Sequence, residues 1–531
     1  MKQTTKTLGT MGLLAALALA VAFAAAWAGR DEEKKVEEKA KAEKLFSFDK
    51  AQARRVLLSR DGKLVADIKR DDEKARWMIL QPVHTEADQP AVNAIVDKLE
   101  TLQQKAELDG MDEKAAGLAE GAPARIEVTI ADGSGKSLAG LALGEENSFD
   151  STLFAKKLGE KTLRSVNKAD QTPLEKELFD LRDKRVARLD DVTQVQVLEV
   201  DPSSQGVLPG GAAMAPGTFG YLLTRNPGGW DLSRPVKGAA DPATAERILT
   251  QLKLLRATKI AAESADDAAL AKFGLAFPKE TIALTLKLPG GEAQARTIRI
   301  GQPARTDGSV TVKTYAKSSD SPLVYEIDSA ILRELSKDLF ELQDKSLVKF
   351  DREAVRRIDF ASPGHETLSI ARSKSTPVDG GAPDESFTLL QPQPGPVRKW
   401  KASGALFSLG NLKAAAFGEA TPADPKGLAR FGLDHPRTIT AYGDNNVVLA
   451  KVLLGGEVPG EAPKPGSKTP PKKRHYAMVE GGQHIVEVDA APLNDFPQTV
   501  QEVLDVPVTA GDAGVSISAG ASPANLVHPA E

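Results

Sequence analysis

The sequence predicts an α+β protein in which three tandem repeats, each an antiparallel sheet with packed helices, follow an N-terminal transmembrane helix. Three observations lead to this fold class: a long uncharged segment near the N-terminus, a pattern that recurs three times after it, and strand-like and helix-like periodicities within each copy. The chain has 531 residues, enough for three or four domains of ordinary size.

The composition and the lack of cysteine exclude several classes of protein. With 41% apolar and 27% charged residues, the chain is globular rather than fibrous or disordered. A net charge of −4 gives no overall attraction to nucleic acid, so we expect no nucleic-acid partner. Without cysteine there is no disulfide scaffold, thiolate zinc site, iron–sulfur cluster or cysteine nucleophile.

The first 29 residues predict a membrane anchor. Lys2 and Lys6 precede an uncharged stretch at 8–29, which matches the roughly 20 residues that span a bilayer core. This stretch is longer than the apolar region of a usual signal peptide. A small-x-small sequence at 26–28 leaves a cleaved signal peptide open, and a buried helix of a soluble protein is the remaining alternative. We predict an uncleaved signal anchor.

The orientation of this anchor follows from the short N-terminus. Basic residues flank the span on both sides, so their count gives no clear bias. Signal anchors translocate the long remainder of the chain, so we expect residues 30–531 outside the cytoplasm. The predicted localisation is the inner (cytoplasmic) membrane, single-pass, with a periplasmic ectodomain. Residues 30–44 predict a helical stalk with acid-before-base pairs four residues apart, such as Asp31 with Lys35.

The three copies are recognisable from how each one opens and ends. An apolar residue followed by aspartate opens each copy, at 48–49, 189–190 and 350–351. The ends also match, because ELFDLRDKRVARLD at 177–190 is similar to DLFELQDKSLVKFD at 338–351. The predicted domains are a signal anchor at 1–29, a charged stalk at 30–44, repeat units at 45–188, 189–349 and 350–507, and a disordered tail at 508–531.

A helix is predicted in the first half of each unit. An aromatic residue stands five positions before a proline in each copy: Trp77/Pro82, Trp230/Pro235 and Phe387/Pro392. One apolar helical face follows in the first copy and recurs at an offset of 153 in the second: Val92, Ile95, Val96, Leu99 and Leu102, then Ala245, Ile248, Leu249, Leu252 and Leu255. Asp88 and Asp241 occupy the N-cap position, and Pro90 and Pro242 the first turn, whereas Arg398 replaces the aspartate in the third copy.

Strands and hairpins are predicted after each helix. Apolar residues alternate at 126–130 and again at 282–286, and a second strand ends in Gly144, Gly301 or Gly455. Short strands joined by turns favour an antiparallel sheet. Three low-complexity segments, at 201–217, 373–385 and 457–474, are predicted to be loops.

These features together resemble domain of unknown function family 4340. The resemblance rests on the anchor, the stalk, the aromatic-x4-Pro pattern with its helix, and Phe-Gly-Leu-x2-Pro before a strand, at 273–278 and 431–436. The first unit departs from this motif, with Gly117-Leu118 and a late Pro123. The resemblance implies a single-anchor extracytoplasmic protein, of a kind often encoded beside gliding-motility-type ABC transporters and their auxiliary subunits. It supplies no catalytic residues.

One segment looks like part of a phosphate-binding loop. Residues 132–137 read DGSGKS, but Ile130 stands where that motif requires glycine. A functional loop must also lead from a strand into a helix, whereas residues 138–144 predict a returning strand. We therefore predict a hairpin turn.

The histidines and the remaining candidate side chains favour structural roles. The six histidines are His84, His365, His435, His475, His484 and His528. None of them has the i,i+4 spacing of a metalloprotease motif, although His475 and His484 can approach each other across a hairpin. Asp88 and Asp241 are candidates for paired carboxylates, but the capping role fits their position better. Trp77 and Trp230 can stack on a sugar, but their place before an apolar helix favours the core.

A basic loop is the last candidate for binding. It contains Lys464, Lys468, Lys472, Lys473 and Arg474, which can attract anionic lipid or polymer. We prefer a solvated loop.

We therefore expect a non-enzymatic, membrane-anchored interaction protein, accessory to an ABC-transport or motility-type envelope system. Its expected partner is an ABC permease or auxiliary subunit. We expect no catalytic, cofactor-binding or metal-binding residues. The alternative is an envelope ligand-binding module for glycan or peptidoglycan, and the discriminating feature is a concave site where aromatic and polar side chains converge.

Overall fold

The computed structural model describes residues 44–202, 219–303, 313–375, 384–422, 424–459, 472–482 and 484–505. The predicted anchor at 1–29, nearly all of the stalk, and the tail at 508–531 lie outside these residues. In the described ranges, no helix has both the length and the apolar character needed to cross a membrane.

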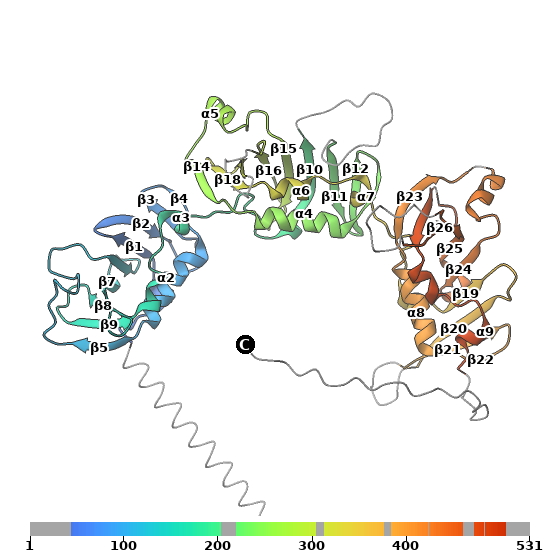
Figure 1. Ribbon diagram of the computed structural model, residues 1–531, viewed down its shortest axis with the longest axis horizontal. Coiled ribbons are helices and arrows are strands. Elements are labelled where there is room, and N and C mark those ends of the chain that lie inside the picture. The colour runs from blue at the N-terminus through green and yellow to red at the C-terminus, as the bar shows by residue number, and fades with distance from the viewer. Residues whose placement is uncertain are drawn as a thin grey trace, which may run out of the picture. The chain divides into compact units, whose positions relative to one another are not determined.

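The described residues form three antiparallel sheets of nine strands, and all three sheets have the same strand order (Figure 1). In the first sheet the order is β4-β3-β2-β1-β6-β7-β8-β9-β5. The second sheet runs from β13 to β14 and the third from β22 to β23 in the same pattern. The predicted tripled, sheet-rich α+β fold is therefore confirmed.

The first repeat contains these strands: β1 (Arg55–Arg60), β2 (Lys63–Lys69), β3 (Met78–Gln81), β4 (Thr85–Glu86), β5 (Gln104–Leu108), β6 (Ile126–Ala131), β7 (Ser137–Asn147), β8 (Thr152–Lys157) and β9 (Leu163–Asn167). Its helices are α2 (Gln89–Thr101) and α3 (Leu178–Leu181), with short 3-10 helices η1 (Lys50–Gln52) and η2 (Lys168–Gln171). Helix α2 connects β4 and β5, the two edge strands of the sheet.

The second repeat contains these strands: β10 (Val195–Pro202), β11 (Tyr221–Asn226), β12 (Gly229–Arg234), β13 (Gly238–Ala240), β14 (Lys259–Ala262), β15 (Glu280–Lys287), β16 (Ala293–Ile300), β17 (Lys313–Ser318) and β18 (Val324–Asp328). Its helices are η3 (Val192–Gln194), α4 (Pro242–Leu254), α5 (Asp267–Lys272), α6 (Ala330–Leu335) and α7 (Leu339–Leu342). Alternate residues of β15 are buried, as a strand with one face on the core requires.

The third repeat contains these strands: β19 (Arg357–Ala361), β20 (Leu368–Ser375), β21 (Asp384–Gln391), β22 (Gly395–Pro396), β23 (Ala414–Ala420), β24 (Arg437–Tyr442), β25 (Val448–Glu457), β26 (Arg474–Val479) and β27 (His484–Asp489). Its helices are η4 (Arg352–Ala354), α8 (Lys399–Gly410), η5 (Pro425–Phe431), η6 (Asp444–Asn446), η7 (Ala491–Asp495) and α9 (Val500–Val503).

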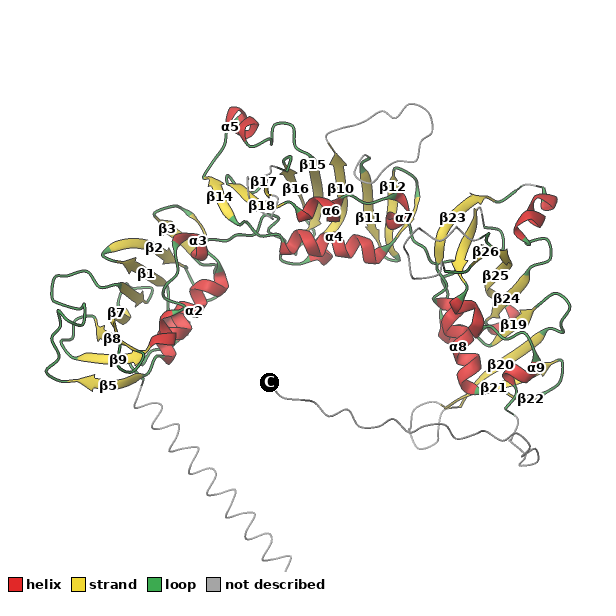
Figure 2. Ribbon diagram, in the orientation of Figure 1, coloured by secondary structure: helices red, strands yellow, loops and turns green. Residues whose placement is uncertain are grey.

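One helix packs on its sheet in each repeat, and the sequence explains where it begins (Figure 2). The Asp88 side chain accepts a hydrogen bond from the Ala91 amide at 3.0 Å, and Asp241 accepts one from Thr244 at 2.9 Å. Both N-cap predictions are confirmed. Arg398, at the equivalent position before α8, makes no side-chain capping bond. The predicted apolar faces of α2 and α4 are buried with few exceptions, and they form the core against the sheet.

The glycines predicted to end the second strand have a steric cause, but the predicted strand end is wrong in two copies. Strand β7 continues past Gly144 to Asn147, and β25 continues past Gly455 to Glu457, whereas β16 ends just before Gly301. A Cβ atom on Gly144 would lie 2.0 Å from the Ala116 carbonyl oxygen, and one on Gly455 would lie 2.2 Å from that of Phe431. These carbonyls belong to the turn that contains the Phe-Gly-Leu motif, whose Gly432 has a φ of +64°. Gly117 has a φ of +68°, so the first repeat keeps this turn although its sequence departs from the motif.

The chain also divides into two compact units, Met1–Val207 with Arg247–Ser336 and Leu208–Glu246 with Lys337–Glu531. The division separates β11–β13 from the other strands of the second sheet. The repeat boundaries predicted from sequence therefore remain predictions, although each repeat has its own sheet.

Candidate functional site

The segment that ends the first repeat makes backbone hydrogen bonds both to the first repeat and to the second repeat. The amides of Asp88 and Asp183 donate to the carbonyls of Leu181 and Glu86, at 2.7 and 3.0 Å. Further along, the Val186 amide donates to Leu255 at 3.2 Å, and the Ala257 amide donates to Lys184 at 2.8 Å. Residues 181–190, called here the 1–2 joint, therefore connect the edge of the first sheet to the segment that follows α4.

The equivalent segment at 342–351, called here the 2–3 joint, repeats this pattern. The Asp241 amide donates to Leu342 and the Asp344 amide to Ala239, both at 2.9 Å. The Leu347 amide donates to Leu412 at 3.0 Å, and Ala414 donates to Lys345 at 2.7 Å. The matching sequences at the ends of the units are thus the joints between successive repeats.

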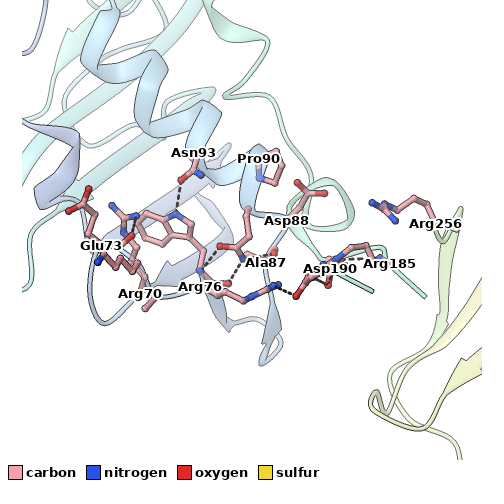
Figure 3. A pocket seen from close by; sticks show the side chains of 15 residues that line it. Arg70, Glu73, Arg76, Ala87, Asp88, Pro90, Asn93, Arg185, Asp190 and Arg256 are labelled. Carbon is pink, nitrogen blue, oxygen red and sulfur yellow. Dashed lines mark hydrogen bonds and ion pairs between the residues drawn. The ribbon is translucent and has the colours of Figure 1, made fainter. Parts of the chain in front are cut away.

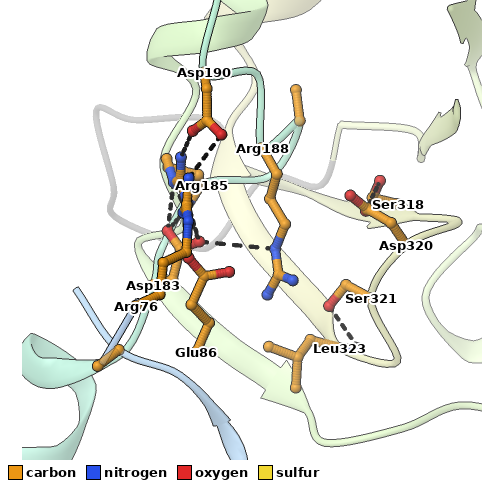
Figure 4. A network of polar contacts seen from close by, with 12 residues as sticks. Arg76, Glu86, Asp183, Arg185, Arg188, Asp190, Ser318, Asp320, Ser321 and Leu323 are labelled. Atoms are coloured by element: carbon orange, nitrogen blue, oxygen red, sulfur yellow. Dashed lines mark hydrogen bonds and ion pairs between the residues drawn. The ribbon is translucent and has the colours of Figure 1, made fainter. Parts of the chain in front are cut away.

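A network of charged side chains surrounds the first joint (Figure 4), whereas Lys345 with Asp241 and Lys349 with Asp344 form separate ion pairs at the second joint. Arg185 binds Asp183 through Nε at 2.9 Å and Asp190 through a terminal nitrogen at 2.5 Å. Arg76 binds Glu86 and also Asp190, the latter at 2.7 Å. In the 2–3 joint, the positions of Arg76, Glu86 and Arg185 hold a glycine, an alanine and a serine: Gly229, Ala239 and Ser346.

The environment of this cluster favours the charged forms of its members. Hydrogen bonding to the buried Asp183 carboxylate raises the pKa of Arg185 above its ordinary value. Burial alone would raise the pKa of Asp190, but hydrogen bonds from Arg76 and Arg185 lower it below its ordinary range. The Asp190 carboxylate therefore stays ionised and bound to Arg76 and Arg185 at neutral pH.

A pocket of about 520 Å³ lies beside this cluster (Figure 3). Its lining includes Arg70, Trp77 and Asn93 from the first repeat, Arg185 from the joint and Arg256 after α4. Trp77 is only 1% exposed, and its Nε1 donates to Asn93 at 2.9 Å. The Arg70 guanidinium lies 4.4 Å from the centre of the indole ring, so the outer face of the ring is covered.

The second tryptophan has the same environment. Trp230 is buried, its Nε1 donates to Glu246 at 3.1 Å, and Arg225 lies 4.3 Å from its ring centre. Both tryptophans are core residues, as the sequence predicted, and neither presents a face on which a sugar can stack.

The segment at 132–137 is a hairpin turn between β6 and β7, so that prediction is also confirmed. One oxygen of Asp132 accepts hydrogen bonds from the Ser134 hydroxyl at 2.7 Å and from the Ser134 and Lys136 amides at 2.8 and 3.0 Å. These bonds lower the pKa of Asp132, the Ser134 hydroxyl contributing most. The Ser134 and Lys136 amides of the turn therefore donate to a carboxylate of the same turn.

The histidines do not converge in the described residues. The strand register places His475 opposite Val488 and His484 opposite Ala420. Nδ1 of His475 lies 3.4 Å from the Gly455 carbonyl oxygen. His528 lies outside the described residues. In the part of the chain that the structure describes, no three His, Asp or Glu side chains are placed to hold a metal ion.

The described part of the basic loop is bound to acidic residues. Lys473 pairs with Glu457 at 3.3 Å, and Arg474 pairs with Glu487 at 3.0 Å. Lys464 and Lys468 lie outside the described residues. The described end of the loop is thus a set of surface ion pairs.

Fold and joints define a tandem-repeat α+β protein in which an ion cluster attaches the first joint to the edge of the first sheet. The family model for the Domain of unknown function (DUF4340) matches residues 77–209 and 230–426, and the chain belongs to this family. Comparison with curated proteins gave no match, and comparison with solved structures gave none.

Sequence reasoning missed the ion cluster of the 1–2 joint. The signal was present, because the unit ends at 177–190 and 338–351 match closely. This match marked the boundary between two units, but it did not show which distant residues contact the boundary segment. Arg76 and Glu86 lie about a hundred residues away from the segment in sequence, and only the fold brings them to it.

Proposed function

We propose that this chain is a non-enzymatic, membrane-anchored interaction protein of the cell envelope, accessory to an ABC-transport or motility-type system. The observation that carries the proposal is the joint, which hydrogen-bonds to sheet and helix segments on both of its sides. Repeat proteins commonly bind other proteins through surfaces to which successive repeats contribute, and the joints link successive repeats of this chain. The side chains of the ion cluster hold the 1–2 joint against the first repeat.

The cellular location is part of the same proposal. It rests on the uncharged stretch at 8–29, which is long enough for a bilayer span, and on the family resemblance. Anchoring would confine the repeats near the bilayer and so raise their effective concentration toward membrane subunits. Weak contacts would then suffice for association.

A glycan-binding role has less support. Sugar recognition commonly uses an exposed aromatic face, and arginine side chains cover the faces of Trp77 and Trp230. Charged groups make up much of the lining of the pocket beside Trp77, and three of them, Arg76, Arg185 and Asp190, bind one another. These contacts favour a structural role for that region.

The proposal is tested with the full chain carrying a periplasm-dependent reporter at its C-terminus. We expect reporter activity, and we expect the ABC permease or its auxiliary subunit to co-purify after mild crosslinking. A reporter active only in the cytoplasm would contradict the localisation. Recovery of soluble periplasmic enzymes without either membrane subunit would contradict the accessory role.

A further inference from the structure

Helix α8 of the third repeat carries two aromatic side chains that face solvent. Trp400 is 68% exposed and Phe407 is 57% exposed. Residues spaced by four and seven positions share one face of a helix, so Gly404 lies between them. A Cβ atom on Gly404 would meet nothing within 4 Å, which shows that the surface is open there. Trp400, Gly404 and Phe407 are called here the α8 aromatic face.

The fold does not require these aromatic residues. The opposite side of α8, with Ala402, Ala405, Leu406 and Leu409, is buried and attaches the helix to its sheet. The positions equivalent to Trp400 and Phe407 are Pro90 and Asp97 in α2, and Ala243 and Thr250 in α4. This alignment is fixed by three leucines that end the helical segment, Leu102, Leu255 and Leu412. Their carbonyls accept equivalent hydrogen bonds, from the amides of Leu45, Val186 and Leu347 respectively. Exposed aromatics at both positions are thus specific to the third repeat.

The substitution at Phe407 also removes a carboxylate from a cation. In the first repeat, Lys50 of η1 pairs with Asp97 of α2 at 2.8 Å. The equivalent residues in the third repeat are Arg352 of η4 and Phe407 of α8. The Arg352 guanidinium lies 5.3 Å from the centre of the Phe407 ring and makes no ion pair within the described residues. Among the residues that the structure describes, a cation that has an acidic partner in the first repeat therefore has none in the third.

A hollow of about 460 Å³ adjoins the α8 aromatic face. Ser403, Gly404 and Phe407 line it from the helix, and Arg352 lines it from η4. The first turn of α8 contains no acidic residue, and Lys399 and Lys401 add positive charge to the positive end of the helix dipole. The hollow also contains Arg372, which is paired with Glu353 and Glu385, and the Asp495 carboxylate. The surface thus combines exposed aromatic rings with a depression of mixed charge, in which Arg352 is the arginine without a carboxylate partner among the described residues.

We propose that the α8 aromatic face docks an acidic, amphipathic segment of a protein partner. An apolar side chain of that segment enters the hollow against Phe407 and Trp400, and a carboxylate binds Arg352 in place of the carboxylate that Asp97 supplies in the first repeat. Buried aromatic and arginine anchors are the groups that dominate protein interfaces. The inference rests on the proposed function, because it assigns the surface that the membrane partner contacts.

An anionic bilayer fits this surface less well. Three carboxylates, those of Glu353, Glu385 and Asp495, line the same hollow. Anionic headgroups would meet these carboxylates, whereas a folded segment can direct its single acidic group toward Arg352. A depression also accommodates one protruding side chain better than a fluid surface.

The test uses the full, anchored chain and measures recovery of the ABC permease or auxiliary subunit after mild crosslinking. Trp400→Ala and Phe407→Asp should each reduce recovery by about tenfold or more, as for central interface anchors. Phe407→Asp recreates the cation–carboxylate pair of the first repeat, so it should preserve the fold and the melting temperature. Phe277→Asp, at another exposed phenylalanine in the second repeat, is the matched control and should leave recovery unchanged.

The possible results separate this inference from the proposed function. If the unmodified chain recovers neither subunit, the proposed function fails and the inference fails with it. If it recovers the partner and both α8 variants recover it equally well, only the inference is wrong. Quenching of Trp400 by brominated lipid in proteoliposomes, measured against Trp400→Phe, would also overturn it by showing that the face contacts the bilayer.

Discussion

At the scale of single residues, Glu280 is a buried carboxyl group whose pKa the fold raises. It is 1% exposed at the start of β15, and its Oε1 has no hydrogen-bond partner among the described residues. Burial raises its pKa from 4.5 to about 7. The positive charge of Lys279 opposes this shift, and the negative charge of Asp201 adds to it.

This shift makes stability depend on pH. Between pH 4.5 and about 7 the folded chain binds a proton at Glu280 that the unfolded chain has lost. The free energy of unfolding therefore falls as pH rises through this window, by about 3 kcal/mol, and does not change further from this group above it. Glu280→Gln should remove this decrease and be more stable than the unmodified chain above pH 7.

The measurement is urea unfolding of both proteins at a series of pH values. Glu353→Gln, at an exposed carboxyl, is the control and should follow the unmodified chain. Parallel pH profiles for Glu280→Gln and the unmodified chain would show that the native carboxyl ionises normally.

At the scale of single elements, the helices depend on their caps in two repeats and on tertiary contacts in the third. Asp88 and Asp241 cap α2 and α4. Arg398 makes no side-chain cap, and α8 is held by its buried face. The side chains at equivalent positions of α2 and α4 also bind the indole nitrogens, Asn93 that of Trp77 and Glu246 that of Trp230. Each of these helices is thereby fixed to the strand that carries the tryptophan.

The cap of α2 should be measurable by substitution. Asp88→Ala should lower the free energy of unfolding by about 0.5–2 kcal/mol, because the Ala91 amide loses its acceptor. Asp88→Ser should recover most of this loss, since serine also caps. Thermal melting of the three proteins provides the comparison. A serine variant as unstable as the alanine variant would mean that Asp88 stabilises the chain in some other way.

At the scale of the whole molecule, the joints determine how repeats are linked. Phe340 of α7 packs against Phe417 of β23 with their ring centres 5.4 Å apart, so an apolar contact lies beside the 2–3 joint. Where the described chain has no neighbouring repeat to pack against them, the positions equivalent to these phenylalanines hold polar residues. Glu107 replaces Phe417 in the first repeat, and Gln501 replaces Phe340 at the end of the third. Polar residues there avoid exposing apolar surface to water.

The ion cluster makes the 1–2 joint dependent on a single arginine. The substitution Arg185→Ser introduces a serine like Ser346, the equivalent residue of the 2–3 joint. It leaves the buried Asp183 without its closest cation. Removing one partner of a largely buried ion pair costs about 3 kcal/mol or more, so the melting temperature should fall clearly. Differential scanning calorimetry measures the change.

A matched control is Arg356→Ser, which removes an exposed arginine paired with Asp444. Exposed pairs contribute less than about 1 kcal/mol, so this variant should change the melting temperature little. Equal effects of the two substitutions would contradict a special role for the joint.

The sequence by itself determined the features that depend on neighbouring residues. Residues a few positions apart set the helix faces at 92–102 and 245–255, the caps at Asp88 and Asp241, and the hairpin at 132–137. The constant offsets between copies showed that the chain is a repeat protein. Such signals are readable because backbone periodicity and capping are local.

Only the tertiary structure decided which of these residues form a surface or a cluster. It brought Arg76 and Glu86 to Arg185, covered Trp77 with Arg70, buried Glu280, and left Trp400 and Phe407 exposed. These outcomes depend on contacts between residues far apart in the chain. The side chain of Trp400 shows the same dependence, because only the packing of α8 decides which of its faces the sheet covers.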